Sequence, residues 1–299
     1  MSSVKRYSDQ ELEGLLNDIE SDRVERKRAF KNEGEDARQV VCAFSNDLPF
    51  DLHPIGTSKI DDLSRVIFEN EYLPAAFSKE ILDANNRSYA ERLSSCRMIV
   101  SPDDTTPTIL GLLTLGKNPY DFIPGSYIQF LRINGTELFD PITDEEEIKG
   151  TLPDIIRRTE EKLKAHNRTA VDISSVPQIT TIDYPHIAFQ QILLNAVMHR
   201  SYEGTNAPVR VNWFNDRVEI ISPGGPFGIV TVENFGNPGI IDYRNPNIAE
   251  MFKTLGLVQR YGIGIQTAQN EMKRNGNPPI NFISNQSVVI CVLRSKKQH

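Results

Sequence analysis

The sequence of 299 residues has few cysteines and no long hydrophobic run. Cys42, Cys96 and Cys291 are odd in number and far apart, which argues against a disulfide framework and predicts free thiols in a reducing cytoplasm. No apolar stretch approaches the ~18 residues that a membrane-spanning helix needs. The first residues lead into a charged segment rather than an apolar signal. We therefore expect a cytoplasmic protein without a membrane partner.

A basic surplus is also absent. The formal net charge is −7 and the isoelectric point is near 5.4, whereas a protein that coats nucleic acid is usually basic. The five histidines are scattered, and no metal-ligand spacing is visible. Charge therefore neither predicts nor excludes contact with DNA. DNA, another protein and a second copy of the chain stay open as partners.

Turn signals divide the chain into three predicted parts: 1–58, 59–178 and 179–299. Residues 48–58 are rich in turn formers and predict a linker. The first part is expected to be helical, and the second is expected to be mixed α/β. The elements expected in the second part are helices at 60–73, 78–85 and 88–97, strands at 108–115 and 126–133, and a helix that starts at the acidic residues 144–147 and ends near His166.

Two features of the second part have an alternative interpretation. Lys117 follows a glycine at a predicted strand end, and we interpret it as a solvated turn lysine, with phosphate binding as the alternative. The acidic run 144–147 favours the start of a helix, where carboxylates interact well with the helix dipole. Metal binding is the alternative for this run.

The third part contains a nearly all-apolar helix, 187–199, which is crossed by one polar stripe. Gln191, Asn195 and His199 are spaced i, i+4, i+8 and share one face of this helix. A buried amide without a partner costs roughly 1–3 kcal/mol. The stripe therefore needs backbone, water or a polar ligand as its partner.

Turn and glycine elements follow this helix in an informative order. They are a hairpin of 209–214 and 217–222, the turn Ser222–Gly225, a helix from Asn245-Pro246 to Leu255, a last helix opened by Gly262-Ile263-Gly264, and a closing hairpin of 280–284 and 287–293. Glycines at a helix N-terminus let backbone N–H groups approach an anion closely. The order predicts a nucleotide site on a helix-and-sheet sandwich.

Residues 184–265 resemble the divergent GHKL-type (Bergerat) nucleotide-binding module of prokaryotic Schlafen-related transcriptional regulators, which are often labelled RecG-like. The matching segments are Asn195–Tyr202, Asp216–Gly225, Tyr243–Pro246 and Gln259–Ile265. Residues 60–175 resemble the linker portion of the same proteins. The resemblance implies an α+β fold in which a C-terminal Bergerat sandwich follows a mixed α/β linker domain and a short helical N-terminal remnant.

The resemblance also implies a site for ATP and Mg²⁺, with Asn195 as the metal ligand. The residues that it assigns to the cofactor are Asn195, His199, Ser222, Gly224, Gly225, Arg244, Asn245, Gly262 and Gly264. Gln191 stands where the family has its catalytic glutamate, and a neutral amide is no general base. Residues 222–225 replace the adenine-reading Asp-x-Gly element. We therefore expect an ATP-binding regulator without efficient hydrolysis and with no catalytic residue; the alternative is an interaction or scaffold protein with an empty pocket.

A second resemblance lies near the N-terminus. Glu20–Lys27 and Val41–Asp47 resemble the opening of the Schlafen AlbA-type domain, whose nuclease members hold a divalent metal through two such acids and a third on a later strand. Glu20 and Glu25 match the first two acids. The chain then passes from 46–49 almost directly to the linker, so this domain looks truncated. A metal-dependent nuclease is the third hypothesis, and ordinary surface acids are the simpler interpretation.

Overall fold

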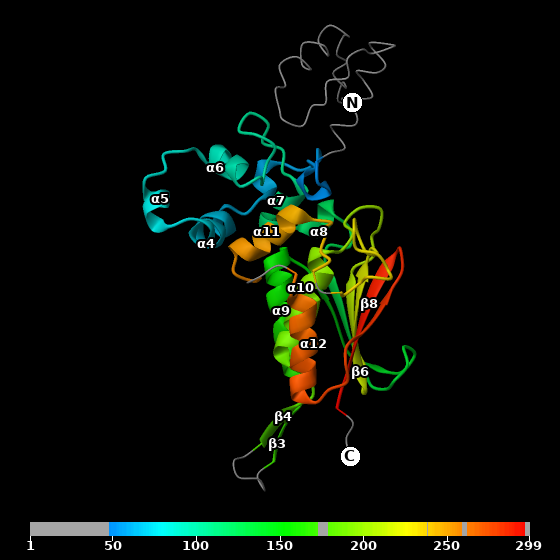
Figure 1. The fold of residues 1–299 in the computed structure, drawn as a ribbon. Helices are drawn as coiled ribbons and strands as arrows, with labels where there is room; N and C mark the ends of the chain where they lie inside the picture. The colour runs from blue at the N-terminus through cyan, green and yellow to red at the C-terminus, as the bar shows by residue number, and fades with distance from the viewer. Residues whose placement is uncertain (1–47, 173–178, 238, 259–261, 297–299) are drawn as a thin grey trace, which may run out of the picture. The chain divides into compact units, whose positions relative to one another are not determined.

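The structure is a computed structural model that describes residues 48–172, 179–237, 239–258 and 262–296 (Figure 1). The chain separates into two units, Met1–Pro49 and Phe50–His299, and the fold below is that of the second unit. The helix expected in the first part, together with Glu20 and Glu25, lies outside the described residues. The nuclease hypothesis therefore stays a prediction.

The second unit is built on a six-stranded mixed sheet in the order β2-β1-β5-β6-β8-β7. Its strands are β1 (Ile128–Ile133), β2 (Ile142–Ile148), β5 (Val209–Trp213), β6 (Arg217–Pro223), β7 (Asn281–Ser284) and β8 (Val288–Arg294). β1 runs parallel to β5, and every other neighbouring pair is antiparallel. The sheet therefore crosses the expected boundary at 178/179, and the division into those two parts stays a prediction.

Three long helices lie along one face of the sheet (Figure 1). They are α9 (Leu152–His166), α10 (His186–Met198) and α12 (Gly264–Asn275). α10 contacts α9, α12 and β6, so it is enclosed on several sides and its apolar residues are buried nearly all round. The predicted helix at 187–199 is confirmed, and so are the hairpin β5–β6 and the last helix and hairpin.

The remaining described elements are shorter. Those before β1 are the 3₁₀ turns Phe50–Leu52 and Ile60–Asp62, α3 (Arg65–Ile67), the π-helical turn Phe68–Tyr72, α4 (Leu73–Ala76), α5 (Lys79–Asp83), α6 (Tyr89–Ser95), α7 (Ile109–Leu115) and α8 (Pro119–Phe122). α11 (Pro246–Thr254) packs against α7, and a two-stranded hairpin, β3 (Thr169–Asp172) and β4 (Ile179–Ile182), follows α9. The capping box at Ser88 is confirmed, since the Ser88 amide donates to the Glu91 carboxylate at 2.7 Å.

Two predicted elements were wrong. The segment expected as a strand at 108–115 is helix α7, and all seven of its residues are buried. A helix that is apolar on every side has no 3.6-residue period to distinguish it from a buried strand. The acidic run expected to open a helix lies on β2, where Asp144 and Glu146 accept hydrogen bonds from Lys162 of α9 at 2.9 and 2.7 Å.

A buried carboxylate joins the first described turn to the C-terminal half of the unit. Asp51 is fully buried, and it accepts hydrogen bonds from the backbone N–H groups of Asn247 and Ile248 at 2.7 and 2.9 Å. The Asn247 side-chain amide donates a third at 2.9 Å. Burial raises the pKa of Asp51, while these bonds act in the opposite direction. Asp51 thus caps α11 from a distant part of the chain.

Candidate functional site

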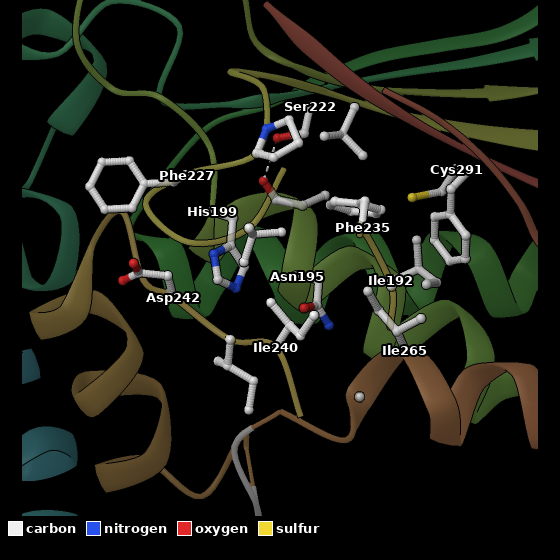
Figure 2. Close-up of a pocket in the computed structure, with 18 of the residues that line it drawn as sticks. Ile192, Asn195, His199, Ser222, Phe227, Phe235, Ile240, Asp242, Ile265 and Cys291 are labelled. Carbon is white, nitrogen blue, oxygen red and sulfur yellow. Dashed lines mark hydrogen bonds between the residues drawn. The ribbon is translucent and has the colours of Figure 1, made fainter. Parts of the chain in front are cut away.

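A cavity opens where the end of α10, the start of α12, β6 and β8 meet (Figure 2). The covering segment, residues 226–237 and 239–242, forms its remaining wall. One half of the cavity is apolar and is lined by Ile192, Ile220, Phe235, Ile265, Phe282 and Val289. The cavity measures about 120 Å³, which is less than the ~300–1,000 Å³ of most small-molecule pockets.

The polar stripe of α10 supplies two of the polar groups in this cavity. The Asn195 amide nitrogen donates to the Gln191 carbonyl of its own helix at 2.6 Å, so its side-chain oxygen is the group left for a ligand. The His199 ring stacks on Tyr243, with centroids 5.4 Å apart. Burial, aided by the nearby Arg244 charge, lowers the pKa of His199 to about 4. His199 is therefore neutral at pH 7.

The start of α12 lies directly against this stripe. A Cβ atom added at Gly264 would lie 2.8 Å from Gln191 Oε1 and 2.9 Å from Asn195 Nδ2. Gly262 has a φ of +75°, and a side chain there would overlap Ile241. Ile263, at the N-cap, offers no capping oxygen to the first N–H groups of α12. The positive φ favours glycine at 262, and the lack of a side chain at 264 lets the start of α12 approach α10 closely.

The turn at 222–225 serves as a wall of the cavity. Ser222 Oγ donates to the Ala196 carbonyl of α10 at 2.7 Å. The Gly224 N–H donates to Ser287 at 2.8 Å, and the Gly225 N–H donates to Gln286 at 3.2 Å. These donors are therefore occupied within the protein. The turn's glycines allow close contact with the β7–β8 turn, since a Cβ at Gly225 would overlap that backbone.

Arg244 and Asn245 lie beside the cavity and do not line it. The Arg244 guanidinium lies 4.9 Å from the centre of the Phe227 ring and donates to the Gly225 carbonyl at 3.1 Å. Asn245 is buried and donates to the carbonyls of Met198 and Arg200 at 2.9 and 2.8 Å. Asn245 therefore caps the end of α10. The other seven predicted residues do line the cavity: Asn195, His199, Ser222, Gly224, Gly225, Gly262 and Gly264.

The covering segment was not predicted from the sequence as part of the site. Asp242 is the one carboxylate that lines the cavity among the described residues, and it accepts from the Ile229 N–H at 3.1 Å and the Tyr243 N–H at 2.8 Å. Gln266 of α12 donates to the Gly236 carbonyl at 2.9 Å and so attaches the segment to the helix. The apolar residues of this segment have neither a helical nor a strand period, so no simple pattern marks them. Lys117 is exposed in a turn after α7, away from the cavity.

Residues 206–293 match a family model described as "Putative ATP-dependent DNA helicase recG C-terminal". This match begins just before β5 and includes the covering segment and α12. The DIP2311 protein from Corynebacterium diphtheriae has a similar structure, with a TM-score of 0.61 and 18% identity. The likeness covers 83% of this chain and 48% of that one, so this chain spans about half its length. At this identity the likeness shows the fold alone, and no curated protein matches the chain.

The comparisons and the structure together confirm the expected α+β fold. In the part of the chain that is described, no helix is long and apolar enough to cross a membrane. Among the same residues, no group of three or more His, Cys, Asp or Glu side chains is placed to hold a metal ion.

Proposed function

We propose that this cavity binds ATP and that the protein is an ATP-binding regulator without efficient hydrolysis. The observation that carries the proposal is the meeting of Asn195 with the uncapped start of α12 at an apolar cavity. Helix N-termini attract phosphate because their N–H groups and dipole are both favourable to an anion. The family model that matches 206–293, named for an ATP-dependent protein, supports the same ligand.

The size and polarity of the cavity favour different places for the base and for the phosphates of the nucleotide. The apolar half, between β6, β8 and Phe235, suits the flat base. A cavity of about 120 Å³ does not enclose a whole nucleotide, so the phosphates would lie at its open side, beside Gly264 and the first N–H groups of α12. Asn195 stands between the two regions and lies beside Gly264 at the start of α12.

Hydrolysis needs a group that accepts a proton from water, and the cavity offers poor ones. Gln191, which lies beside Gly264 and outside the cavity lining, is a neutral amide. The Asp242 carboxylate accepts hydrogen bonds from the backbone N–H groups of Ile229 and Tyr243. His199, with a pKa of about 4, is too weak a base for efficient proton transfer near pH 7. We therefore propose binding with slow or no turnover.

The side-chain oxygen of Asn195 is a suitable ligand for Mg²⁺. This oxygen is a hard ligand of the kind that the ion prefers, and Mg²⁺ is commonly held by protein oxygens together with substrate phosphates. The Asn195 oxygen and the phosphates of the bound nucleotide would hold the ion. In this role Mg²⁺ neutralises phosphate charge beside α12.

A thermal-shift titration with ATP or ADP and Mg²⁺ tests the proposal. A ligand at a hundred times its Kd stabilises the folded state by about 2.7 kcal/mol, which is an easily measured shift. Asn195→Ala is expected to reduce the shift, whereas Gln190→Ala, on the same helix but outside the cavity lining, is expected to keep it. The absence of a shift in the unmodified protein would contradict the proposal.

The second candidate is an interaction or scaffold protein whose pocket stays empty. The small cavity favours it, and so do the internal bonds of Ser222, Gly224 and Gly225. Under this candidate, ATP leaves the thermal transition unchanged in both the unmodified protein and Asn195→Ala. In either case we propose that regulation acts through DNA, a protein partner or a second copy of the chain.

A further inference from the structure

A second cavity, of about 620 Å³, lies at the other end of α10. It is lined by Asp183 and Tyr184, which precede the helix, whereas His199 of the first cavity follows it. A helix of 13 residues separates the two ends by about 20 Å. The volume falls within the ~300–1,000 Å³ of typical small-molecule pockets. This inference does not rest on nucleotide binding in the first cavity.

Cationic side chains outnumber acidic ones in this second cavity. The cations are Arg132, Arg168, Arg294 and Lys296, and the acids are Asp183 and Asp216. His166 also lines it, and this side chain is bonded to Asp144 at 2.8 Å. Asp216 is shared between Arg217, at 3.0 Å, and Arg294, at 3.6 Å. The cavity therefore has a positive surplus on its walls.

Three of these four cations have no ion-pair partner in the part of the chain that the structure describes. Within it, Arg132, Arg168 and Lys296 form no ion pair, and the Arg132 guanidinium donates only to neutral oxygens, those of Ile133, Trp213 and Asn215. These bonds to β1 and to the end of β5 hold Arg132 in a fixed orientation. Burial lowers the pKa of Arg132, and the charge of Arg168 adds to the effect. Two arginines that repel each other in this way are stabilised by an anion between them.

A cluster of packed rings around Trp213 lines the same cavity. Trp213 is 4% exposed, and its ring centre lies 5.9 Å from that of His166, 5.6 Å from that of Tyr184 and 5.4 Å from that of Phe189. Well-packed side chains keep one arrangement. The aromatic wall of the cavity and the Arg132 side chain are therefore preorganised for a ligand.

We propose that this second cavity binds a small molecule through a phosphate group. Several unpaired cations around one space favour an anion with more than one charge, and a phosphate group carries about two near pH 7. Arginine suits this role because its planar fork of N–H donors matches phosphate oxygens. The space beyond the arginines accommodates an organic remainder or a second phosphate.

Intrinsic tryptophan fluorescence can follow binding in this cavity, because Trp213 lines it and is the single tryptophan of the chain. Pyrophosphate and inorganic phosphate are titrated into the full chain at low salt while tryptophan emission is followed, with acetate as a singly charged comparison. A saturable change with pyrophosphate and phosphate, and none with acetate, is expected. Arg168→Gln is expected to weaken binding about tenfold, which is the scale of one charge-assisted hydrogen bond. Arg157→Gln is the matched control, since this arginine is an exposed residue of α9 outside the cavity.

Two further variants make the result decisive. Lys296→Gln replaces Arg168→Gln if the latter fails to fold, as judged by circular dichroism, and it is also expected to weaken binding. Asn195→Ala disables the first cavity and is expected to leave the fluorescence titration unchanged. The proposal is overturned if pyrophosphate gives no saturable change in the unmodified protein, if acetate competes equally well, or if Arg168→Gln and Lys296→Gln both bind as tightly as the unmodified protein. Loss of the signal in Asn195→Ala would likewise overturn it.

Discussion

Replacing Gly264 by alanine is expected to weaken ATP binding while it leaves the stability of the fold nearly unchanged. The added Cβ would meet Gln191 Oε1 at 2.8 Å and Asn195 Nδ2 at 2.9 Å, and both atoms are ends of side chains that can rotate. Alanine is also favoured over glycine in helices by up to about 1 kcal/mol. We therefore expect the free energy of unfolding to change by less than about 1 kcal/mol. ATP affinity should fall about tenfold, because Asn195 is displaced and one hydrogen bond contributes ~1–1.5 kcal/mol.

Gly276→Ala, at the other end of the same helix, is the matched control. Gly276 has a φ of +81° at the C-terminal cap of α12, far from the cavity lining. Alanine in this conformation costs roughly 1–2 kcal/mol, so stability should fall while ATP affinity is kept. Urea unfolding gives the first quantity and isothermal titration calorimetry gives the second. Unchanged ATP affinity in Gly264→Ala, or weakened affinity in Gly276→Ala, would refute the placement of the phosphates beside α12.

Three other predictions concern stability, pH and catalysis. Asp51→Ala leaves three donors of α11 without an acceptor and should lower the free energy of unfolding in urea by about 3 kcal/mol. Asp51→Asn keeps one oxygen and should lower it by about half as much. Equal losses in the two variants would contradict the capping role of Asp51. The lowered pKa of His199 means that only the unfolded chain takes up its proton between pH 6.5 and about 4, so stability falls as the pH drops through this window. His199→Gln should lose less stability than the unmodified protein between pH 7 and pH 5, and an identical loss would contradict this assignment. Gln191→Glu should raise ATP hydrolysis measured by phosphate release, and a rate no higher than that of the unmodified protein would show that more than the base is absent.

Much of the C-terminal half could be predicted because its signals are local. The proline after Asn245 fixes its own φ, Gly262 permits a positive φ, and the Asn-Asp pair at 215–216 favours a tight turn; none of these signals depends on distant residues. The stripe of Gln191 and Asn195 was predicted from spacing alone, and both side chains do face the start of α12.

The misplaced elements depended on contacts between distant segments. Helix α7 is buried on every side, so its sequence has no period, and Gly111 fits where a side chain would overlap the Met98 carbonyl. Asn245 is predicted to contact the ligand, and the structure adds that its side-chain amide caps α10 from nearly fifty residues away. Asp51 reaches α11 from almost two hundred residues away. The second cavity gathers Arg132, Arg168 and Trp213 from separate elements, which no sequence window contains.

Hydrogen–deuterium exchange of the full chain, with and without ATP and Mg²⁺, tests the central claim most directly. If the nucleotide occupies the first cavity, protection should appear in the first turn of α12 and in the covering segment, and it should be reduced in Asn195→Ala. The first half of α9 should exchange at the same rate in both states, since it does not line this cavity. No protection at α12, or protection confined to other elements, would contradict the account.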